Sequence, residues 1–180
     1  MRQIKYNGLS WIDILNPTDE DIEFLEKNYQ FHHLILEEIK TPTYHPLIES
    51  YGTYLFLILH FPNYFKKINR IQSVEIDFLI TKDTLITVRY NDFPDLDAIY
   101  GEISDKQPDF SNKTTGHLFH KIVKKLFSRM FPELYKIKES IDGVEDHIFK
   151  DFDESVIGAI ALIKRQILDF IRALKPQKAV

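Results

Sequence analysis

Two neighbouring glutamates, Glu37 and Glu38, are the residues whose type and position point most directly to chemistry in this sequence. They lie near the end of a short helix predicted over residues 32–40, where carboxylates face the unfavourable end of the helix dipole. Carboxylate oxygens are the ligands that Mg²⁺ and Ca²⁺ prefer. The placement points to an outside cation, and a solvated helix face is the simpler alternative.

The seven histidines offer a second kind of metal chemistry. His117 and His120 would share one face of a helical turn, and with acidic residues from elsewhere they could chelate a transition metal. Two partly exposed histidines near a helix start are the simpler interpretation. The six glycines are scattered, so the sequence has no glycine-rich phosphate loop and no nucleophile elbow. We therefore predict no catalytic residues, and a metal-dependent hydrolase built on these two histidines is the alternative.

Composition narrows the class of partner. The 180 residues contain no cysteine, which excludes disulfides and thiolate zinc sites, and their net charge is −4. Acidic side chains outnumber basic ones 18 to 11 over residues 1–113, whereas the remainder is basic. An acidic front part argues against a nucleic-acid partner, because phosphate binding requires a basic surface. Divalent cations are better candidates.

Apolar runs in the sequence are short. The longest, residues 54–59 and 156–163, fall short of the roughly 18 residues that a membrane-spanning helix requires. The N-terminus has no apolar signal core. The sequence alone therefore predicts a soluble chain located in the cytoplasm.

Strands are predicted in the first half of the chain. Residues 9–15 alternate in polarity, and residues 54–59 are apolar on both faces, as in a central strand of a sheet covered on both sides. Residues 74–80 and 84–90 also read as strands, and the two residues Lys82-Asp83 predict a β-hairpin between them.

Helices are predicted before and after these strands, and only helices are predicted in the last third of the chain. Thr18 is the predicted N-cap of a first helix, with Asp21 three residues later and further acids in its first turn. A helix is expected over residues 96–103, and residues 104–116 form a junction. This pattern divides the chain into an α/β domain, residues 1–113, and a helical part, residues 114–180.

Two long helices, residues 115–149 and 156–174, carry apolar side chains at nearly heptad spacing. Pro132 falls in a four-residue stutter of the first and is expected to bend it. A short connection over residues 150–153 allows the two helices to pair antiparallel. The second helix has more apolar surface than one partner covers, so a soluble dimer built on this seam, with no ion, is a further alternative.

Six segments, in this order and spacing, resemble the cytoplasmic domain of the CorA family of magnesium and cobalt transporters. The similarity covers nearly the whole chain, and each piece is degenerate while the series is fairly specific. The segments are residues 11–18, 33–39, 51–59, 85–88, 130–132 and 172–176.

The resemblance implies a fold and a location. CorA-like proteins have an α/β domain, with a mixed sheet between helical layers, followed by a long helical hairpin, a stalk and two membrane helices. They are homopentamers whose soluble domain lies at the cytoplasmic face of the cell membrane. The family's Gly-Met-Asn pore signature is absent from this sequence. We therefore expect a non-enzymatic fragment that is cut off at Val180, where the stalk begins.

The resemblance also implies a role for the two glutamates. In the family, cations bound between neighbouring cytoplasmic domains hold the pore closed, and a Leu-Glu-Asp motif contributes. Leu36-Glu37-Glu38 occupies that position here, with Glu38 where the family often has aspartate. The implied regulatory ion is Mg²⁺, with Co²⁺ or Zn²⁺ as alternatives, since zinc-transporting members share the architecture.

Overall fold

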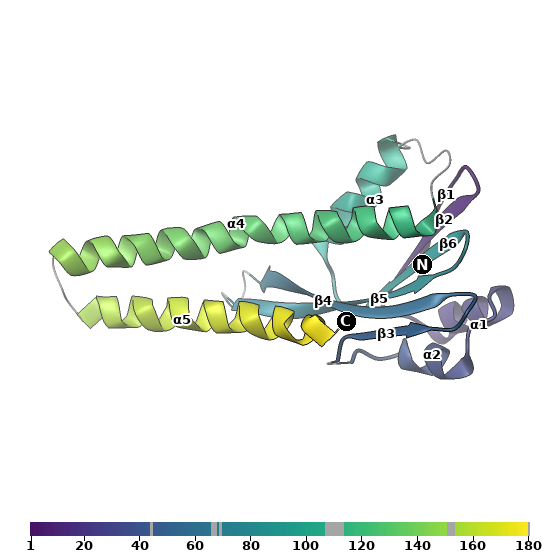
Figure 1. Ribbon diagram of the computed structural model, residues 1–180, viewed down its shortest axis with the longest axis horizontal. Coiled ribbons are helices and arrows are strands. Elements are labelled where there is room, and N and C mark those ends of the chain that lie inside the picture. The colour runs from purple at the N-terminus through teal and green to yellow at the C-terminus, as the bar shows by residue number, and fades with distance from the viewer. Residues whose placement is uncertain (44, 66–67, 69, 107–113, 151–153, 180) are drawn as a thin grey trace.

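The structure, a computed structural model, describes residues 1–43, 45–65, 68, 70–106, 114–150 and 154–179. Its centre is a six-stranded sheet in the order β1-β2-β6-β5-β4-β3. The β2–β6 pair is parallel, and the other four neighbouring pairs are antiparallel. Helices lie on both faces of this sheet (Figure 1), which confirms the predicted mixed sheet between helical layers.

The four predicted strands are present as β2 (Leu9–Leu15), β4 (Leu55–Phe65), β5 (Arg70–Ile80) and β6 (Thr84–Arg89). The predicted hairpin between β5 and β6 is confirmed. Both β4 and β5 are longer than expected, because their antiparallel ladder continues as far as the pair Phe65 and Arg70.

Two edge strands were missed by the sequence analysis, β1 (Arg2–Tyr6) and β3 (Leu47–Ser50). Each is short and pairs with one neighbour, so little in its own residues marks it. A two-residue turn joins β1 to β2, and both Asn7 and Gly8 have positive φ, at 48° and 79°. Such turns favour an Asn-Gly pair, because asparagine and glycine tolerate the left-handed conformation.

One face of the sheet is covered by α1 (Asp19–Asn28) and α2 (His33–Glu38). The predicted cap of α1 is confirmed: Asp21 N–H donates to Thr18 Oγ1, and Thr18 N–H donates to the Asp21 carboxylate. The second helix is shorter than predicted, because His32 and Ile39 are its extended N-cap and its C-cap.

The other face is covered by α3 (Pro94–Lys106), α4 (Thr115–Lys150) and α5 (Glu154–Leu174), and a 3-10 turn, η1 (Lys175–Ala179), follows. The helices α4 and α5 run side by side as a hairpin that extends past the end of the sheet (Figure 1). The predicted helical hairpin is therefore confirmed. Residues 107–113 of the predicted junction and residues 151–153 of the predicted connection lie outside the described residues.

The heptad seam of this hairpin is only partly buried, although Val156, near the start of α5, is only 2% exposed. Over the sheet, Leu126 and Met130 are buried. Farther along the hairpin, Ile141, Ile148 and Ile160 are each at least 40% exposed. The seam thus leaves apolar surface uncovered in the described chain, as its sequence predicts. No helix in the described part is long and apolar enough to cross a membrane.

Pro132 lies inside α4, and the helix continues through it. Proline removes one backbone hydrogen bond from a helix interior without necessarily ending the helix.

A bidentate ion pair connects the hairpin to the sheet. Arg70, at the start of β5, donates from Nε and Nη2 to the Asp169 carboxylate of α5 at 2.8–3.0 Å. Past the end of α5, Gln177 Nε2 donates to the His60 carbonyl of β4. The end of the described chain is therefore held against the β4–β5 part of the sheet.

Candidate cation site

The short helix α2 positions the two glutamates that the sequence analysis selected. Its apolar residues Ile35 and Leu36, with the cap residue Ile39, are buried against the sheet. Successive residues of a helix point about 100° apart, so two adjacent side chains cannot face the same surroundings. As a result Glu37 is exposed, whereas Glu38 is partly buried.

Glu37 already has a basic partner. Lys40 Nζ lies 2.6 Å from Glu37 Oε1. This hydrogen bond lowers the pKa of the Glu37 carboxyl group. A second cation at Glu37 would have to displace or share the lysine ammonium group.

Glu38 has acidic neighbours instead. Burial, then Glu49 of β3, then Glu75 of β5, raise the pKa of Glu38. In the described part of the chain, no lysine or arginine forms an ion pair with it. A carboxylate placed among like charges gains most from an added cation. Of the two predicted ligands, Glu38 is therefore the one whose surroundings favour a metal ion.

Two further acids lie beneath this helix end, on the face of β5 that α1 and α2 cover. Glu75 and Asp77 are two residues apart on one strand and so point to the same face. Glu75 and Asp77 alternate with Val74 and Ile76, a pattern typical of a strand with one solvated face. In the structure, however, both acids are buried. We refer to Glu38, Glu49, Glu75 and Asp77 as the acidic cluster.

Hydrogen bonds hold part of the acidic cluster in place. Thr43 N–H donates to Glu75 Oε1 at 2.9 Å, whereas Glu75 Oε2 makes no hydrogen bond, although His60 Nε2 lies 3.2 Å from it. Tyr51 Oη donates to Glu49 Oε2 at 2.5 Å, which raises the pKa of Tyr51 to about 12. These bonds fix the carboxylates but bring no positive charge of a lysine or arginine among them.

The acidic cluster is not a closed metal centre in a single copy of the chain. Within the described residues, no three histidine or acidic side chains converge closely enough to hold one ion. Mg²⁺ commonly uses one or two protein carboxylates and keeps several waters, so an incomplete protein set does not exclude it.

His117 and His120, the two histidines predicted to share a helix face, lie near the start of α4. His117 Nδ1 accepts from Thr114 N–H at 3.2 Å, just before α4, and both His117 and His120 are exposed. No third ligand joins them among the residues that the structure describes. A different histidine, His60 of β4, is buried beside Glu75.

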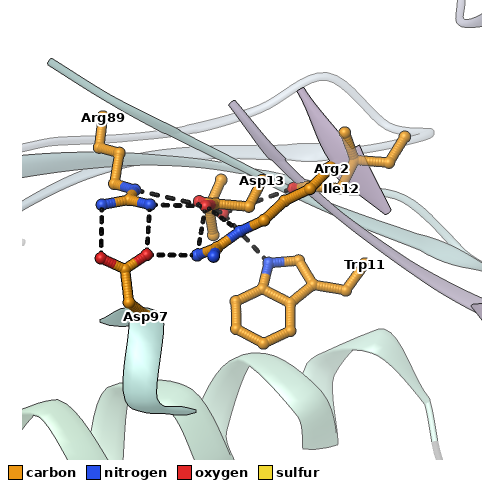
Figure 2. A network of polar contacts seen from close by, with 7 residues as sticks. Arg2, Trp11, Ile12, Asp13, Arg89 and Asp97 are labelled. Atoms are coloured by element: carbon orange, nitrogen blue, oxygen red, sulfur yellow. Dashed lines mark hydrogen bonds and ion pairs between the residues drawn. The ribbon is translucent and has the colours of Figure 1, made fainter. Parts of the chain in front are cut away.

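A second polar network lies on the opposite face of the sheet, and sequence reasoning missed it. Arg89 Nη2 lies 3.1 Å from Asp13 Oδ2 and 2.6 Å from Asp97 Oδ1, and Arg2 contacts the same two carboxylates (Figure 2). Trp11 stands beside it. The two arginines and the two aspartates make this network electrically neutral, so it has no unpaired charge for a ligand. Because it connects β1, β2, β6 and α3, we refer to these four residues as the structural clamp.

Trp11 extends the clamp into the strands. Its Nε1–H donates to Thr87 Oγ1 at 3.1 Å, and Thr87 donates to Asp13 Oδ1 at 2.7 Å. The sequence did offer a signal, since Asp13 and Arg89 are charged residues within strands that are otherwise largely apolar.

Comparison with known proteins decides the family. The profile of the family described as CorA-like Mg²⁺ transporter protein matches residues 6–180. The chain belongs to the CorA family. The resemblance found in its sequence motifs is therefore confirmed.

The curated relatives of this chain are distant in sequence. YfjQ of Bacillus subtilis is 24% identical over 168 residues, which are 93% of this chain and 51% of that protein. The cobalt/magnesium transport protein CorA of Thermotoga maritima is 20% identical over 172 residues, which are 95% of this chain and 49% of that protein.

The soluble domain of CorA from Methanocaldococcus jannaschii superposes with a TM-score of 0.78 at 20% identity. That match covers 96% of this chain and 68% of the CorA domain. The chain spans about half the length of the curated CorA-family relatives described above.

Proposed function

We propose that this chain is the cytoplasmic regulatory domain of a CorA-like divalent cation transport protein, and that it is not itself an enzyme. A cation bound at Glu38, between neighbouring subunits, favours the closed pore. The observation that carries this proposal is the setting of Glu38, which is partly buried among acids and has no basic partner in the described chain.

Neighbouring copies would complete the site. Because no three ligands converge within one described chain, the remaining ligands come from a second subunit and from water. A homopentamer at the cytoplasmic face of the membrane supplies such neighbours. Ligands shared between subunits make cation binding depend on how the subunits are arranged, which a site within one subunit would not do.

The mechanism is a shift of population. A cation that binds the closed arrangement more tightly than the open one favours closure by that difference in affinity, and by no more. When the cation leaves, the carboxylates repel one another and closure weakens. Falling cytosolic Mg²⁺ would then open the pore, which gives negative feedback on uptake.

The chemistry of the ligands bears on which ion regulates. Carboxylates and water suit Mg²⁺, whereas Zn²⁺ favours imidazole and thiolate ligands. Glu38 has carboxylates around it, and His60 is directed to Glu75 and Thr43 instead. We therefore favour Mg²⁺ over Co²⁺ and Zn²⁺ as the regulatory ion.

The test is transport by the full-length protein carrying Glu38→Gln, with Glu26→Gln as the matched control. Glutamine keeps the shape and removes the charge, and Glu26 is an exposed acid on α1. We expect the Glu38 variant to stay open at Mg²⁺ concentrations that close the wild type and the control. Unchanged closure in the Glu38 variant would remove this residue from the sensor, and closure by Zn²⁺ at lower concentrations than Mg²⁺ would identify zinc as the regulator.

A further inference from the structure

The hydroxyl group of Tyr90 lies between two oxygen atoms and has one hydrogen to give. Its Oη is 2.6 Å from Asp77 Oδ2 and 3.1 Å from the Ile39 carbonyl oxygen. A carbonyl oxygen only accepts hydrogen bonds. If Tyr90 donates to Ile39, the hydrogen in its contact with Asp77 has to come from Asp77.

The surroundings of Asp77 favour a neutral carboxyl group. Asp77 is 1% exposed, and its Oδ1 has no hydrogen-bond partner. Burial, Glu75 and Glu38 raise the pKa of Asp77 well above its ordinary value, against the lowering effect of the Tyr90 hydrogen bond. An uncompensated carboxylate in such a place is far more costly than a neutral acid.

In the part of the chain that the structure describes, no lysine or arginine forms an ion pair with Asp77. On β4, His60 Nε2 lies 3.1 Å from the Thr43 carbonyl oxygen and 3.2 Å from Glu75 Oε2. On α2 the nearby charged group is Glu38, which is acidic. No three histidine or acidic side chains converge closely enough among the described residues to form a metal centre around Asp77.

We propose that Asp77 is a buried proton-binding site, with its carboxylic acid donating from Oδ2–H to Tyr90 Oη, and Tyr90 donating in turn to the Ile39 carbonyl. In this arrangement Asp77 Oδ2 donates, Tyr90 Oη both accepts and donates, and the Ile39 carbonyl oxygen accepts. Glu75, two residues away on β5, has a donor of its own, because its Oε1 accepts from Thr43 N–H. The inference concerns a single chain without metal and does not depend on the function proposed for Glu38.

The proton has a structural consequence. Ile39 is the C-cap of α2 and follows Glu38 directly, so the hydrogen-bonded chain fixes the helix end that carries Glu38 to β5 and to the end of β6. When the proton leaves to water, Asp77 becomes an acceptor only. Tyr90 then donates to Asp77, and the Ile39 carbonyl loses its donor. Rising pH should therefore loosen the end of α2.

Infrared difference spectroscopy of the 180-residue chain, at neutral pH and without divalent cations, tests the site directly, because a protonated carboxyl group has its own C=O band. We expect this band in the wild type and in the control Glu37→Gln, and its loss in Asp77→Asn. The absence of the band in the wild type, or its persistence in Asp77→Asn, would overturn the proposal.

A second variant separates the hydrogen bond from a general effect on folding. Tyr90→Phe removes the acceptor of the Asp77 hydrogen, so the C=O band should move to the higher frequency of a carboxyl group that makes no hydrogen bond. An unmoved band in this variant would show that Asp77 does not donate to Tyr90. If Asp77→Asn fails to fold, the wild-type band and its shift in Tyr90→Phe still decide the matter.

Discussion

Arg89 and Asp13 lie 76 positions apart in the sequence and form an ion pair of 3.1 Å in which both side chains are buried. The pair crosses from β6 to β2, the parallel neighbours in the sheet, and Asp97 extends it to α3 (Figure 2). Because charges leave water at a large cost, such a pair persists only when each charge is compensated.

Breaking this pair from one side should be severe. Arg89→Met leaves Asp13 buried with less compensation, so we expect the free energy of unfolding to fall by about 3–5 kcal/mol. Urea denaturation, monitored by tryptophan fluorescence, measures this free energy. Trp11 is the single tryptophan, is buried, and donates to Thr87 within the same network.

The control is Arg2→Ala. Arg2 contacts the same carboxylates, but 36% of its side chain is exposed, so about 1 kcal/mol is expected. Equal losses in the Arg2 and Arg89 variants would contradict the view that burial of Arg89 sets the energy.

The N-cap of α1 predicts a smaller change. Thr18→Ala removes the acceptor of Asp21 N–H and should destabilise the chain by about 1 kcal/mol. Thermal unfolding measures this change, with Thr53→Ala, at an exposed loop position, as the matched control. A Thr18 variant as stable as the control would show that the cap contributes nothing.

The ion pair between Arg70 of β5 and Asp169 of α5 predicts another small loss of stability. Arg70→Ala removes a bidentate contact to Asp169, which is buried but keeps Arg172 at 3.2 Å, so the loss should be only about 1 kcal/mol. Chemical denaturation tests it against Arg165→Ala, an exposed arginine of the same helix. A loss of several kcal/mol would mean that Arg172 does not compensate Asp169.

The free energy of unfolding should fall with rising pH because of Glu38, whereas an acid paired with a basic group makes it rise. The raised pKa of Glu38 means that the folded chain holds the proton to higher pH than the unfolded chain. Wild-type stability therefore falls as pH rises from about 4.5 through the raised value. Without cation, Glu38→Gln should be more stable than the wild type at neutral pH and equal to it at low pH.

Glu23→Gln is the control of opposite sign. Lys27 lowers the pKa of Glu23, so that pair stabilises the fold above the ordinary pKa and loses its effect as pH falls through the lowered value. The Glu23 variant should be slightly less stable than the wild type at neutral pH. Melting temperatures measured across pH decide both cases, and the same sign in the two variants would refute the electrostatic assignment of Glu38.

Local patterns predicted much of the fold. The Thr18 cap, the apolar strand at β4 and the two long helices depend on neighbours a few residues away, so their own residues reveal them. The edge strands β1 and β3 depend on pairing with distant strands, and they were missed. The burial of each residue of the helical seam depends on which other elements pack against it, and spacing along a helix does not record that.

The sequence alone determined the family and selected Glu37 and Glu38, because ordered motifs and a carboxylate pair are properties of the linear chain. Tertiary structure decided that Glu37 pairs with Lys40 while Glu38 faces other acids, and that Asp77 meets Tyr90 beneath α2. The physical reason is that strand register and helix packing set which distant charges share a low-dielectric space. Electrostatic energy depends on that distance and burial, and neither is encoded by position in the chain.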